Sequence, residues 1–200
     1  MIKNTHTFKP IEGKYVNFRE AEVEDSSFIL SLRTDPQKSR FISKTDSDLQ
    51  KQIDYMKRYK TLDNEWYFIV ENKKSEPIGT QRIYRYPSLA DCWISPEDPS
   101  KGIYGPGSWL LKSGISPMES IESDYIVKKF FFETLGQSVH PMMIHEDNKT
   151  VMSFHQKWGA KVFGYDEPSK HYLLNLTKED FEKNKGYFEN FLYGRYKNAL

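Results

Sequence analysis

The chain has 200 residues, of which 38% are hydrophobic and 15% aromatic, enough for one domain of ordinary size with a real core. Its 29 basic and 28 acidic side chains leave a formal charge of +1. A near-neutral chain without a long basic run is a poor candidate for nucleic-acid binding through a charged face, so that class of function is disfavoured.

The cysteine count and the hydropathy of the sequence indicate in which cellular compartment to expect the protein. The single cysteine, Cys92, excludes an internal disulfide framework and is typical of a reducing compartment. The first residues lack the apolar run of a signal peptide, and no stretch approaches the roughly twenty apolar residues of a membrane span. We therefore expect a cytoplasmic protein with no membrane partner.

The first half of the chain predicts three strands and two helices. Alternating residues and strong β-formers indicate the strands, and apolar residues at helical spacing indicate the helices. The second helix is expected to open at Thr45 or Ser47. The expected elements are a strand at 14–19, a helix at 21–34, a helix ending near residue 60, and strands at 65–71 and 78–86. Residues 87–106 are rich in Pro and Gly and are expected to be irregular, with a short strand at 89–94 as one option.

Residues 107–136 read as a strand, a glycine turn and a helix with a clear start and stop. Ser116 suits the N-cap, Glu119 completes a capping box, and Gly136 suits the position just past the helix end. Apolar residues recur widely enough along this helix that most of it should be covered. A strand that runs through a glycine turn into a helix aims free N–H groups at one spot, which makes the turn at 113–115 a candidate phosphate site.

The remaining residues predict a strand at 138–145, a helix at 148–158, a hairpin at 161–165 and 170–176, and a last helix capped by Thr177. The apolar face of that last helix packs either on its own domain or on a second copy, so the protein is expected to be a monomer or a homodimer. We expect one domain over 1–200, with a loose leader at 1–13 and a C-terminal helical extension at 177–200. The order of elements is that of an α/β sandwich.

Four pieces in order resemble the GNAT superfamily of acetyl-CoA-dependent N-acetyltransferases. They are similar to the branch with ribosomal-protein N-acetyltransferases and bacterial surface-sugar acetyltransferases. The pieces are QIDYMKRY with WYFIVEN and PIGTQRIYRY, then GSWLLKSG, then ESIESDYIVKKFFFETLG, and last EDNKTVMSFHQKWGAK. The resemblance covers roughly residues 15–176.

The resemblance implies an α/β (α+β) three-layer sandwich with a mixed, mostly antiparallel sheet. It also implies a V-shaped splay between the fourth and fifth strands, here 108–112 and 138–145. Acetyl-CoA would be the co-substrate, and its pantetheine arm would pair with the fourth strand as a missing strand would. The implied cofactor-binding residues are Trp109, Leu110, Leu111, Lys112, Gly114, Ile115, Ser116, Met118, Asn148 and Phe154. His155 stands where relatives often have the tyrosine that protonates the leaving thiolate, and it is the implied catalytic residue.

Three features depart from the family pattern. The phosphate loop is one residue short and holds a single glycine, Gly114, and Glu119 competes with pyrophosphate for the same amides. No acidic residue lies on the fourth strand, so a general base is sought among Asp91, Glu97 and Asp98 on the preceding loop. Of Arg82 and Arg85, at most one can reach the cleft, where an arginine would suit a phosphate-bearing acceptor.

The leading hypothesis is an N-acetyltransferase that acts on a small-molecule primary amine, with an amino sugar, nucleotide-linked or free, ahead of a protein N-terminus. The alternatives are a catalytically inactive GNAT-fold CoA-binding module and a different α/β protein that binds another phosphate ligand at the central turn. No histidine or cysteine spacing indicates a metal site.

Overall fold

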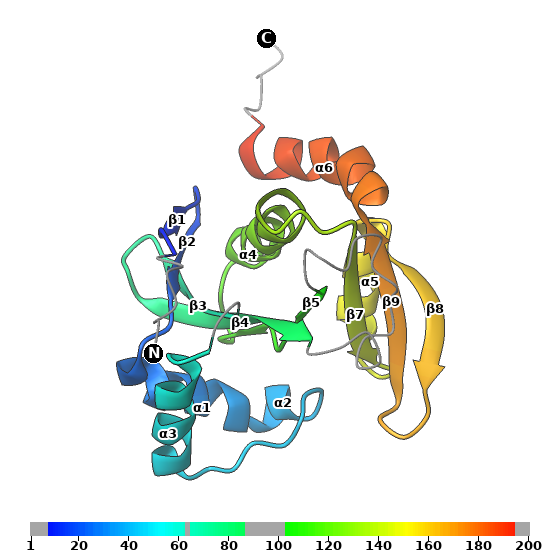
Figure 1. The fold of residues 1–200 in the computed structure, drawn as a ribbon. Helices are drawn as coiled ribbons and strands as arrows, with labels where there is room; N and C mark the ends of the chain where they lie inside the picture. Colours follow the sequence, from blue (N-terminus) through cyan, green and yellow to red (C-terminus); the bar gives the residue numbers. More distant parts are fainter. Residues whose placement is uncertain (1–7, 63–64, 87–102, 195–200) are drawn as a thin grey trace. The chain divides into compact units, whose positions relative to one another are not determined.

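The computed structural model describes residues 8–62, 65–86 and 103–194 (Figure 1). Two compact units are distinguished. One comprises Met1–Tyr86 and Tyr104–Ser123, and the other Pro87–Ile103 and Asp124–Leu200. We call them the first and the second unit and describe each by itself.

The first unit is built on a sheet in which β1 and β2, β2 and β3, β3 and β4, and β4 and β6 pair antiparallel. The strand order is β1-β2-β3-β4-β5, with β6 also on β4. Trp66 to Val70 of β3 are all buried, because both faces of this strand are covered. The strands are β1 (Ile11–Glu12), β2 (Val16–Glu20), β3 (Trp66–Asn72), β4 (Pro77–Tyr86), β5 (Ile103–Pro106) and β6 (Leu110–Leu111).

The helices α1 (Ser26–Thr34), α2 (Pro36–Ser39) and α3 (Leu49–Tyr59) cover one face of this sheet (Figure 1). Apolar side chains of α1 and α3 meet β3 in a core that includes Ile29, Met56 and Ile69. The helix expected at 21–34 begins as a 3₁₀ turn, η1 (Val23–Asp25), and is α-helical only from Ser26.

The prediction that Thr45 or Ser47 opens the next helix is wrong. Asp48 is the N-cap of α3, and its carboxylate accepts a hydrogen bond from the Gln50 N–H at 2.8 Å. Aspartate caps a helix as well as serine does, and the side chain that reaches the amides decides the start.

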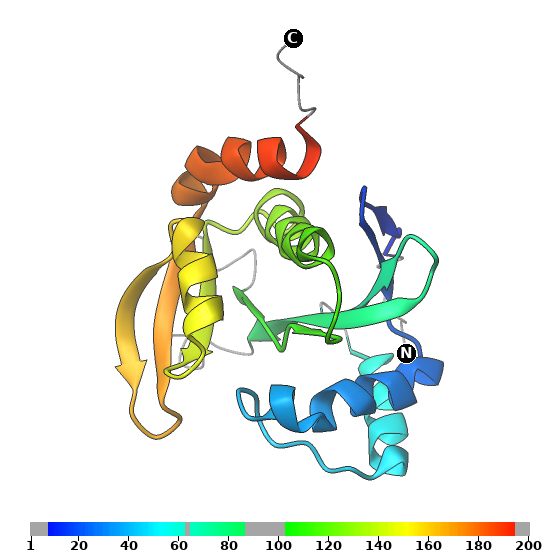
Figure 2. The ribbon, with the colours of Figure 1, turned by 180° about the vertical axis from the view of Figure 1, so that it is seen from behind.

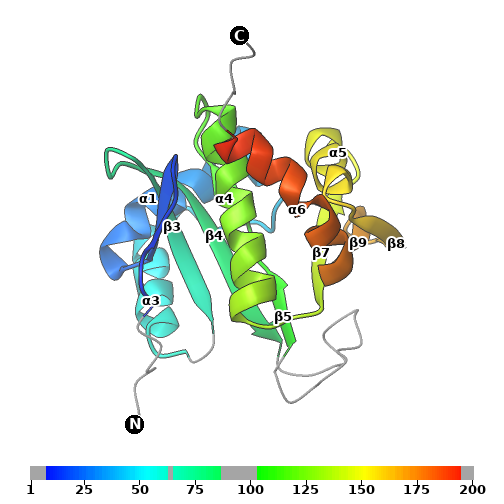
Figure 3. The ribbon, with the colours of Figure 1, turned by 90° about the horizontal axis from the view of Figure 1, so that it is seen from above.

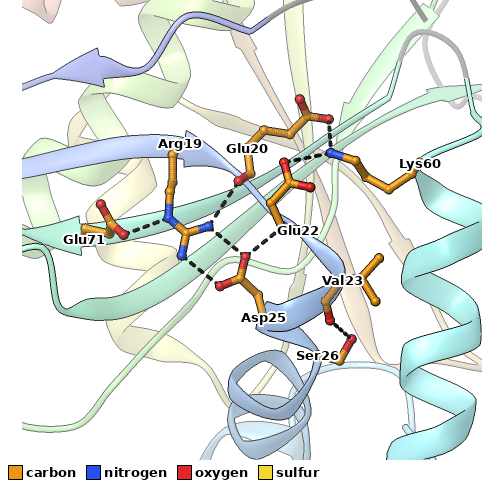
Figure 4. Close-up of polar contacts among 8 residues, drawn as sticks. All are labelled: Arg19, Glu20, Glu22, Val23, Asp25, Ser26, Lys60 and Glu71. Atoms are coloured by element: carbon orange, nitrogen blue, oxygen red, sulfur yellow. Dashed lines mark hydrogen bonds and ion pairs between the residues drawn. The ribbon is translucent and has the colours of Figure 1, made fainter. Parts of the chain in front are cut away.

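A charged network ties the edge of the sheet to η1 (Figure 4). The Arg19 guanidinium donates to both carboxylate oxygens of Asp25, at 2.7 and 2.8 Å, and to Glu71 at 2.7 Å. Asp25 also accepts from the Glu22 N–H at 2.8 Å. Burial acts to raise the pKa of Asp25, but these hydrogen bonds outweigh it and hold the pKa below its usual value. Every charge in the network has a partner, so its role is structural.

Helix α4 (Pro117–Lys129) begins on the opposite face of the first unit's sheet (Figure 3). The Glu122 carboxylate accepts hydrogen bonds from the N–H groups of Lys14, Tyr15 and Val16 at 2.8, 2.6 and 2.8 Å. Gly13 has no room for a side chain, because a Cβ there would lie 2.6 Å from Glu122 Oε2. A carboxylate of the helix thus anchors the start of β2.

The predicted helix continues past Lys129 in a different form. Phe130–Thr134 make a π-helical turn, η4, in which Phe130, Phe131 and Phe132 are all buried. Gly136 follows with φ of +63°, a left-handed conformation that favours glycine. The predicted stop at Gly136 is confirmed, and most of the helix is covered as expected.

The second unit holds a three-stranded antiparallel sheet of order β7-β9-β8, with α5 against it (Figure 2). Its elements are β7 (Val139–His145), α5 (Lys149–Lys157), β8 (Lys161–Asp166), β9 (His171–Thr177) and α6 (Lys178–Tyr193). Trp158 is fully buried and stacks on Phe188 of α6 at 3.5 Å between ring centroids. The predicted cap at Thr177 is confirmed, since its hydroxyl accepts from the Asp180 N–H at 3.0 Å.

Helix α6 packs on its own unit, because Phe181, Phe188 and Leu192 are buried there. Phe191 of the same helix is 47% exposed. Tyr196 and the optional strand at 89–94 lie outside the described residues.

The expected fold class is confirmed as a mixed α/β fold with helices on both faces of an antiparallel sheet. Three expectations fail in detail. Residues 11–12 of the expected leader pair with β2, and 103–106 of the expected irregular stretch form β5. The strand expected at 108–112 is regular only at Leu110–Leu111. β6 and β7, the segments between which a splay was expected, belong to different sheets. The single-domain expectation stays a prediction.

Candidate active site

A β-bulge interrupts the strand that faces β4. The pairing of Leu110 with Thr80 would place Ser108 opposite Arg82. Instead, the Gly107 N–H donates to the Arg82 carbonyl at 2.6 Å. Two residues, Gly107 and Ser108, therefore oppose Arg82, which defines a bulge, a feature that re-aims backbone groups next to active sites.

The register shows which backbone groups of β6 face away from β4. The Lys112 N–H donates to the Ile78 carbonyl at 2.7 Å, and residues alternate along an antiparallel ladder. Leu111 therefore directs its own N–H and C=O to the other edge. Among the described residues, β6 pairs with β4 alone. An amide-bearing chain can add to such an edge as a strand would.

The turn after β6 ends in the predicted capping box. The Glu119 N–H donates to Ser116 Oγ at 3.2 Å, and the Ser116 N–H donates to the Glu119 carboxylate at 2.8 Å. Gly114 has φ of +81° and open space around it, so the turn requires glycine for its backbone and not for packing. The Glu119 carboxylate thus accepts the hydrogen bond of the Ser116 N–H, one of the backbone donors that a phosphate at this turn would use.

Two lysines lie at this turn. Lys38 Nζ of α2 donates to Ser113 Oγ at 2.9 Å, and Lys112 Nζ lies 5.1 Å from the centre of the Phe28 ring. Their ammonium groups would favour an anion here, and Glu119 would disfavour one. A phosphate at this turn would have to compete with the capping carboxylate for the Ser116 N–H.

The remaining implied residues of the first unit divide by exposure. Leu110 is buried and Leu111 partly so, while Lys112, Gly114 and Ser116 are exposed and Ile115 and Met118 are intermediate. Trp109 Nε1 donates to Ser123 Oγ of α4 at 3.3 Å. The side chain of Leu110 thus serves the core, and by the same alternation its backbone groups face β4, opposite Thr80.

The implied residues of the second unit lie on or beside α5. Asn148 is the N-cap of α5, and its side-chain oxygen accepts from the Val151 N–H at 3.4 Å. This contact holds the turn that precedes α5. Phe154 packs edge-to-face on Phe188, with ring centroids 6.4 Å apart.

His155 is part of a buried charged network. Its Nδ1 lies 3.3 Å from Lys128 Nζ, and Lys128 donates to the Asp124 carboxylate. Lys128 is fully buried and Asp124 nearly so. An ammonium group can only donate, so Nδ1 accepts and a neutral imidazole carries its proton on Nε2.

Burial determines the charge of this network. Desolvation, followed by the charge of Lys128, holds the pKa of His155 well below its usual value of 6.5. His140 has the same shift from the same causes, and its ring meets Phe131 at 4.5 Å. Burial also raises the pKa of Asp124 and lowers that of Lys128, each opposed by the charge of the other. An imidazolium at His155 is therefore disfavoured, and its available form is a neutral Nε2–H donor.

The sequence reasoning missed Asp124 and Lys128. Their spacing of four residues on a helix is the available signal, but the same spacing is common on solvated faces. The candidate bases Asp91, Glu97 and Asp98 lie outside the described residues. Of the two arginines, Arg82 is half-buried in the first unit and Arg85 is exposed.

The described part of the chain holds neither a grouping of metal ligands nor a membrane-spanning helix. No three His, Cys, Asp or Glu side chains are grouped there as a metal site would require. No helix there has both the length and the apolar character to span a membrane.

Comparison with known proteins relates this geometry to a family. No family model matches the chain, and no curated protein matches it. Solved structures do match. A nucleotide-linked sugar GNAT, FdhC in its apo form, has 26% identity and a TM-score of 0.73, over 92% of this chain and 98% of that one. A GCN5-related N-acetyltransferase from Brucella melitensis has 15% identity and a TM-score of 0.71, over 95% and 88%.

An aminoglycoside acetyltransferase in complex with coenzyme A also matches, with 15% identity and a TM-score of 0.65 over 85% of this chain and 99% of that one. The matches span nearly the whole of each structure, so the likeness concerns the complete fold. The predicted resemblance is confirmed: the chain has the fold of the GNAT superfamily of acetyltransferases.

Proposed function

We propose that the protein is an acetyl-CoA-dependent N-acetyltransferase that acts on a small-molecule primary amine, with an amino sugar or nucleotide-linked amino sugar as the acceptor. The observation that carries the proposal is the unpaired edge of β6 beside the bulge at Gly107–Ser108, followed at once by the turn and the N-terminus of α4. The nucleotide-linked sugar GNAT among the matching structures supports the choice of acceptor.

The residues of the first unit suit a cofactor with a peptide-like arm and a pyrophosphate. The backbone N–H and C=O of Leu111 would pair with amides of the arm, together with those of Trp109. Lys112, whose backbone faces β4, would contribute its ammonium group to the phosphates. Gly114, Ile115, Ser116 and Met118 would offer amides to the pyrophosphate. In the second unit, Asn148 and Phe154 are proposed to support the arm. Acetyl-CoA supplies a thioester carbonyl that a neutral amine can attack.

The protein's groups would then stabilise charge and move protons. A backbone N–H re-aimed by the bulge is the proposed donor to the oxygen on which negative charge develops. His155 is proposed to stabilise the departing thiolate with a hydrogen bond from its neutral Nε2–H. The proton that the amine loses passes to water, and the thiolate takes up its proton from water. The general base is not assigned to a residue. The single cysteine favours a reducing compartment, and we propose the cytoplasm.

A free-thiol assay with acetyl-CoA tests the proposal. The panel would comprise free amino sugars, nucleotide-linked amino sugars and peptides with free N-termini, and calorimetry would measure acetyl-CoA binding separately. We expect thiol release that depends on the amine and is fastest with the amino sugars. Release only with peptides would favour a protein N-terminal acetyltransferase.

One observation favours a second candidate, a CoA-binding module without turnover. His155 is buried and its pKa is held well below its usual value, so an imidazolium that could protonate the departing thiolate is disfavoured there. Tight acetyl-CoA binding without thiol release on any amine would select this candidate.

The variant His155→Phe tests whether His155 acts in turnover or in acetyl-CoA binding. If His155 stabilises the departing thiolate, the variant should lower turnover at least tenfold while acetyl-CoA affinity changes less than twofold. Full turnover in the variant would leave His155 as a packing residue.

A further inference from the structure

Two arginines of the first unit lie together beside the bulge. Arg33 of α1 donates from one terminal nitrogen to Ser108 Oγ at 3.1 Å, and Ser108 is one of the two bulge residues. Arg82 of β4 is the residue that the bulge opposes, and its carbonyl accepts the Gly107 N–H. The charge of Arg33 contributes to lowering the pKa of Arg82, after burial as the main cause, so the two guanidinium groups repel each other.

Arg33 is surrounded by hydroxyl groups and not by acids. Its Nε donates to Thr45 Oγ1 at 2.7 Å, and its second terminal nitrogen donates to Ser43 Oγ at 3.3 Å. No carboxylate pairs with Arg33 among the residues that the structure describes. The positive charge of a half-buried guanidinium is costly without an anion, so this site favours a negatively charged ligand.

Arg82 has one acidic partner and an aromatic enclosure. It donates to Glu65 at 2.6 Å, and its guanidinium lies 4.1 Å from the Tyr84 ring centre and 5.1 Å from that of Tyr55. Tyr67 is also close, at 5.7 Å, and burial raises the pKa of Tyr67 to about 12, which keeps the phenol uncharged. Glu65 is the only carboxylate bound here within the described chain, so one of two positive charges is neutralised.

Buried polar atoms that lack a hydrogen-bond partner among the described residues are found on Arg82 and on a tyrosine beside it. Arg82 Nε and Tyr55 Oη are buried, and neither has a hydrogen-bond partner among the described residues. Buried donors are normally satisfied, and an unsatisfied group in a native structure points to a missing water or ligand. One atom belongs to the Arg82 guanidinium itself, and the other to Tyr55, whose ring lies beside that guanidinium.

We propose that Arg33 and Arg82 form a binding site for a phosphate or diphosphate group. The tyrosine rings around Arg82 would receive the apolar part of the ligand that carries this group. Resting on the proposed function, this makes the amine acceptor an anionic one, a phosphate-linked amino sugar in preference to a free amino sugar. The site is separate from the amides at the start of α4, which would serve the phosphates of CoA.

Inorganic pyrophosphate is the probe, titrated by calorimetry in the presence of saturating CoA so that the amides at the start of α4 are occupied. Wild-type protein should bind pyrophosphate, and the affinity should fall as salt is raised. Arg33→Gln should weaken binding roughly 10- to 100-fold, the range for loss of a charge-assisted, hydrogen-bonded pair. Arg40→Gln removes the same charge from an exposed neighbouring residue and should change affinity less than twofold.

Circular dichroism of each variant checks folding. Arg33→Lys keeps the charge but loses the planar fork, and it should weaken binding about fivefold. The proposal is overturned if wild-type protein fails to bind pyrophosphate beside CoA. It is equally overturned if Arg33→Gln and Arg40→Gln lose the same affinity, or if Arg33→Lys matches wild type.

The proposed function can fail without the anion site failing. If CoA does not bind at all, acetyl transfer is excluded, yet pyrophosphate titrated alone should still distinguish Arg33→Gln from Arg40→Gln. With active enzyme, Arg33→Gln should raise KM for a nucleotide-linked amino sugar at least tenfold and leave KM for the free amino sugar within twofold. Equal effects on both acceptors would contradict the proposal.

Discussion

The buried pair of Lys128 and Asp124 yields the sharpest stability prediction. Lys128→Met keeps an unbranched apolar stem but removes the ammonium group that contacts Asp124 and His155. Lys128 is fully buried and the Asp124 side chain is 7% exposed, so the carboxylate would be left in the core without its partner. Breaking a buried pair in this way costs about 3–5 kcal/mol, roughly a fifth or more of the 5–15 kcal/mol that stabilises a typical domain.

Urea unfolding at pH 7.5 measures this cost. Trp158 lies 5.3 Å from Lys128 Nζ, so its fluorescence reports on this part of the core. With a slope of about 2–3 kcal/mol per molar urea, the midpoint should fall by roughly 1–2 M. Lys129→Met is the matched control, because the Lys129 side chain is 42% exposed and its pairing with Glu133 is a surface contact worth less than about 1 kcal/mol.

The double variant Asp124→Asn with Lys128→Met distinguishes a lost charge pair from lost packing. Without a buried charge to compensate, the double variant should recover about 2 kcal/mol or more of the loss. A single variant that costs less than about 1 kcal/mol, or a double variant no better than the single, would refute the view that both groups are charged in the folded protein.

Three further predictions concern single residues. Because burial holds the pKa of His140 and His155 well below 6.5, the unfolded chain takes up protons that the folded chain does not as pH falls below about 6.5. The free energy of unfolding should therefore fall toward acid pH by up to about 1.4 kcal/mol per pH unit for each histidine. Urea unfolding at pH 7.5 and at pH 5.5 measures this loss, and in His140→Met the loss between the two pH values should be smaller by the contribution of one histidine. Asn148→Ala should cost about 1 kcal/mol through loss of the α5 cap and weaken acetyl-CoA binding, whereas Asn148→Ser should retain both, and unchanged affinity in the alanine variant would remove the residue from the site. Glu119→Gln should raise acetyl-CoA affinity about 2- to 5-fold in calorimetry, since a carboxylate no longer competes with phosphate at the helix start, and no change would argue against a phosphate there.

Features decided by neighbouring residues could be predicted from the sequence. The capping box of Ser116 and Glu119, the left-handed Gly136 and the cap at Thr177 each depend on a few residues around one helix end. The order of elements also depends largely on local pattern, and it was sufficient to indicate the fold class. Local signals were ambiguous only where two good caps stand close together, as with Ser47 and Asp48.

Features decided by distant residues could not be predicted. The strand at 11–12 exists because β2 offers an edge to it, and nothing in its own two residues marks it. The contact of Arg33 with Ser108 joins positions 75 apart in the chain. His155 was identified from its place in a motif, but its charge state depends on Lys128, 27 residues away.

The hydrogen bonds between the Glu122 carboxylate and the backbone at the start of β2 make limited proteolysis a measure of local opening. Trypsin cuts after lysine. The N–H of the Lys14–Tyr15 peptide bond is one of the three backbone N–H groups that donate a hydrogen bond to the Glu122 carboxylate. That bond is shielded as long as the first turns of α4 stay in place, so its cleavage rate reports local opening of this helix. Glu122→Gln should speed the cut without touching the protease's recognition residue.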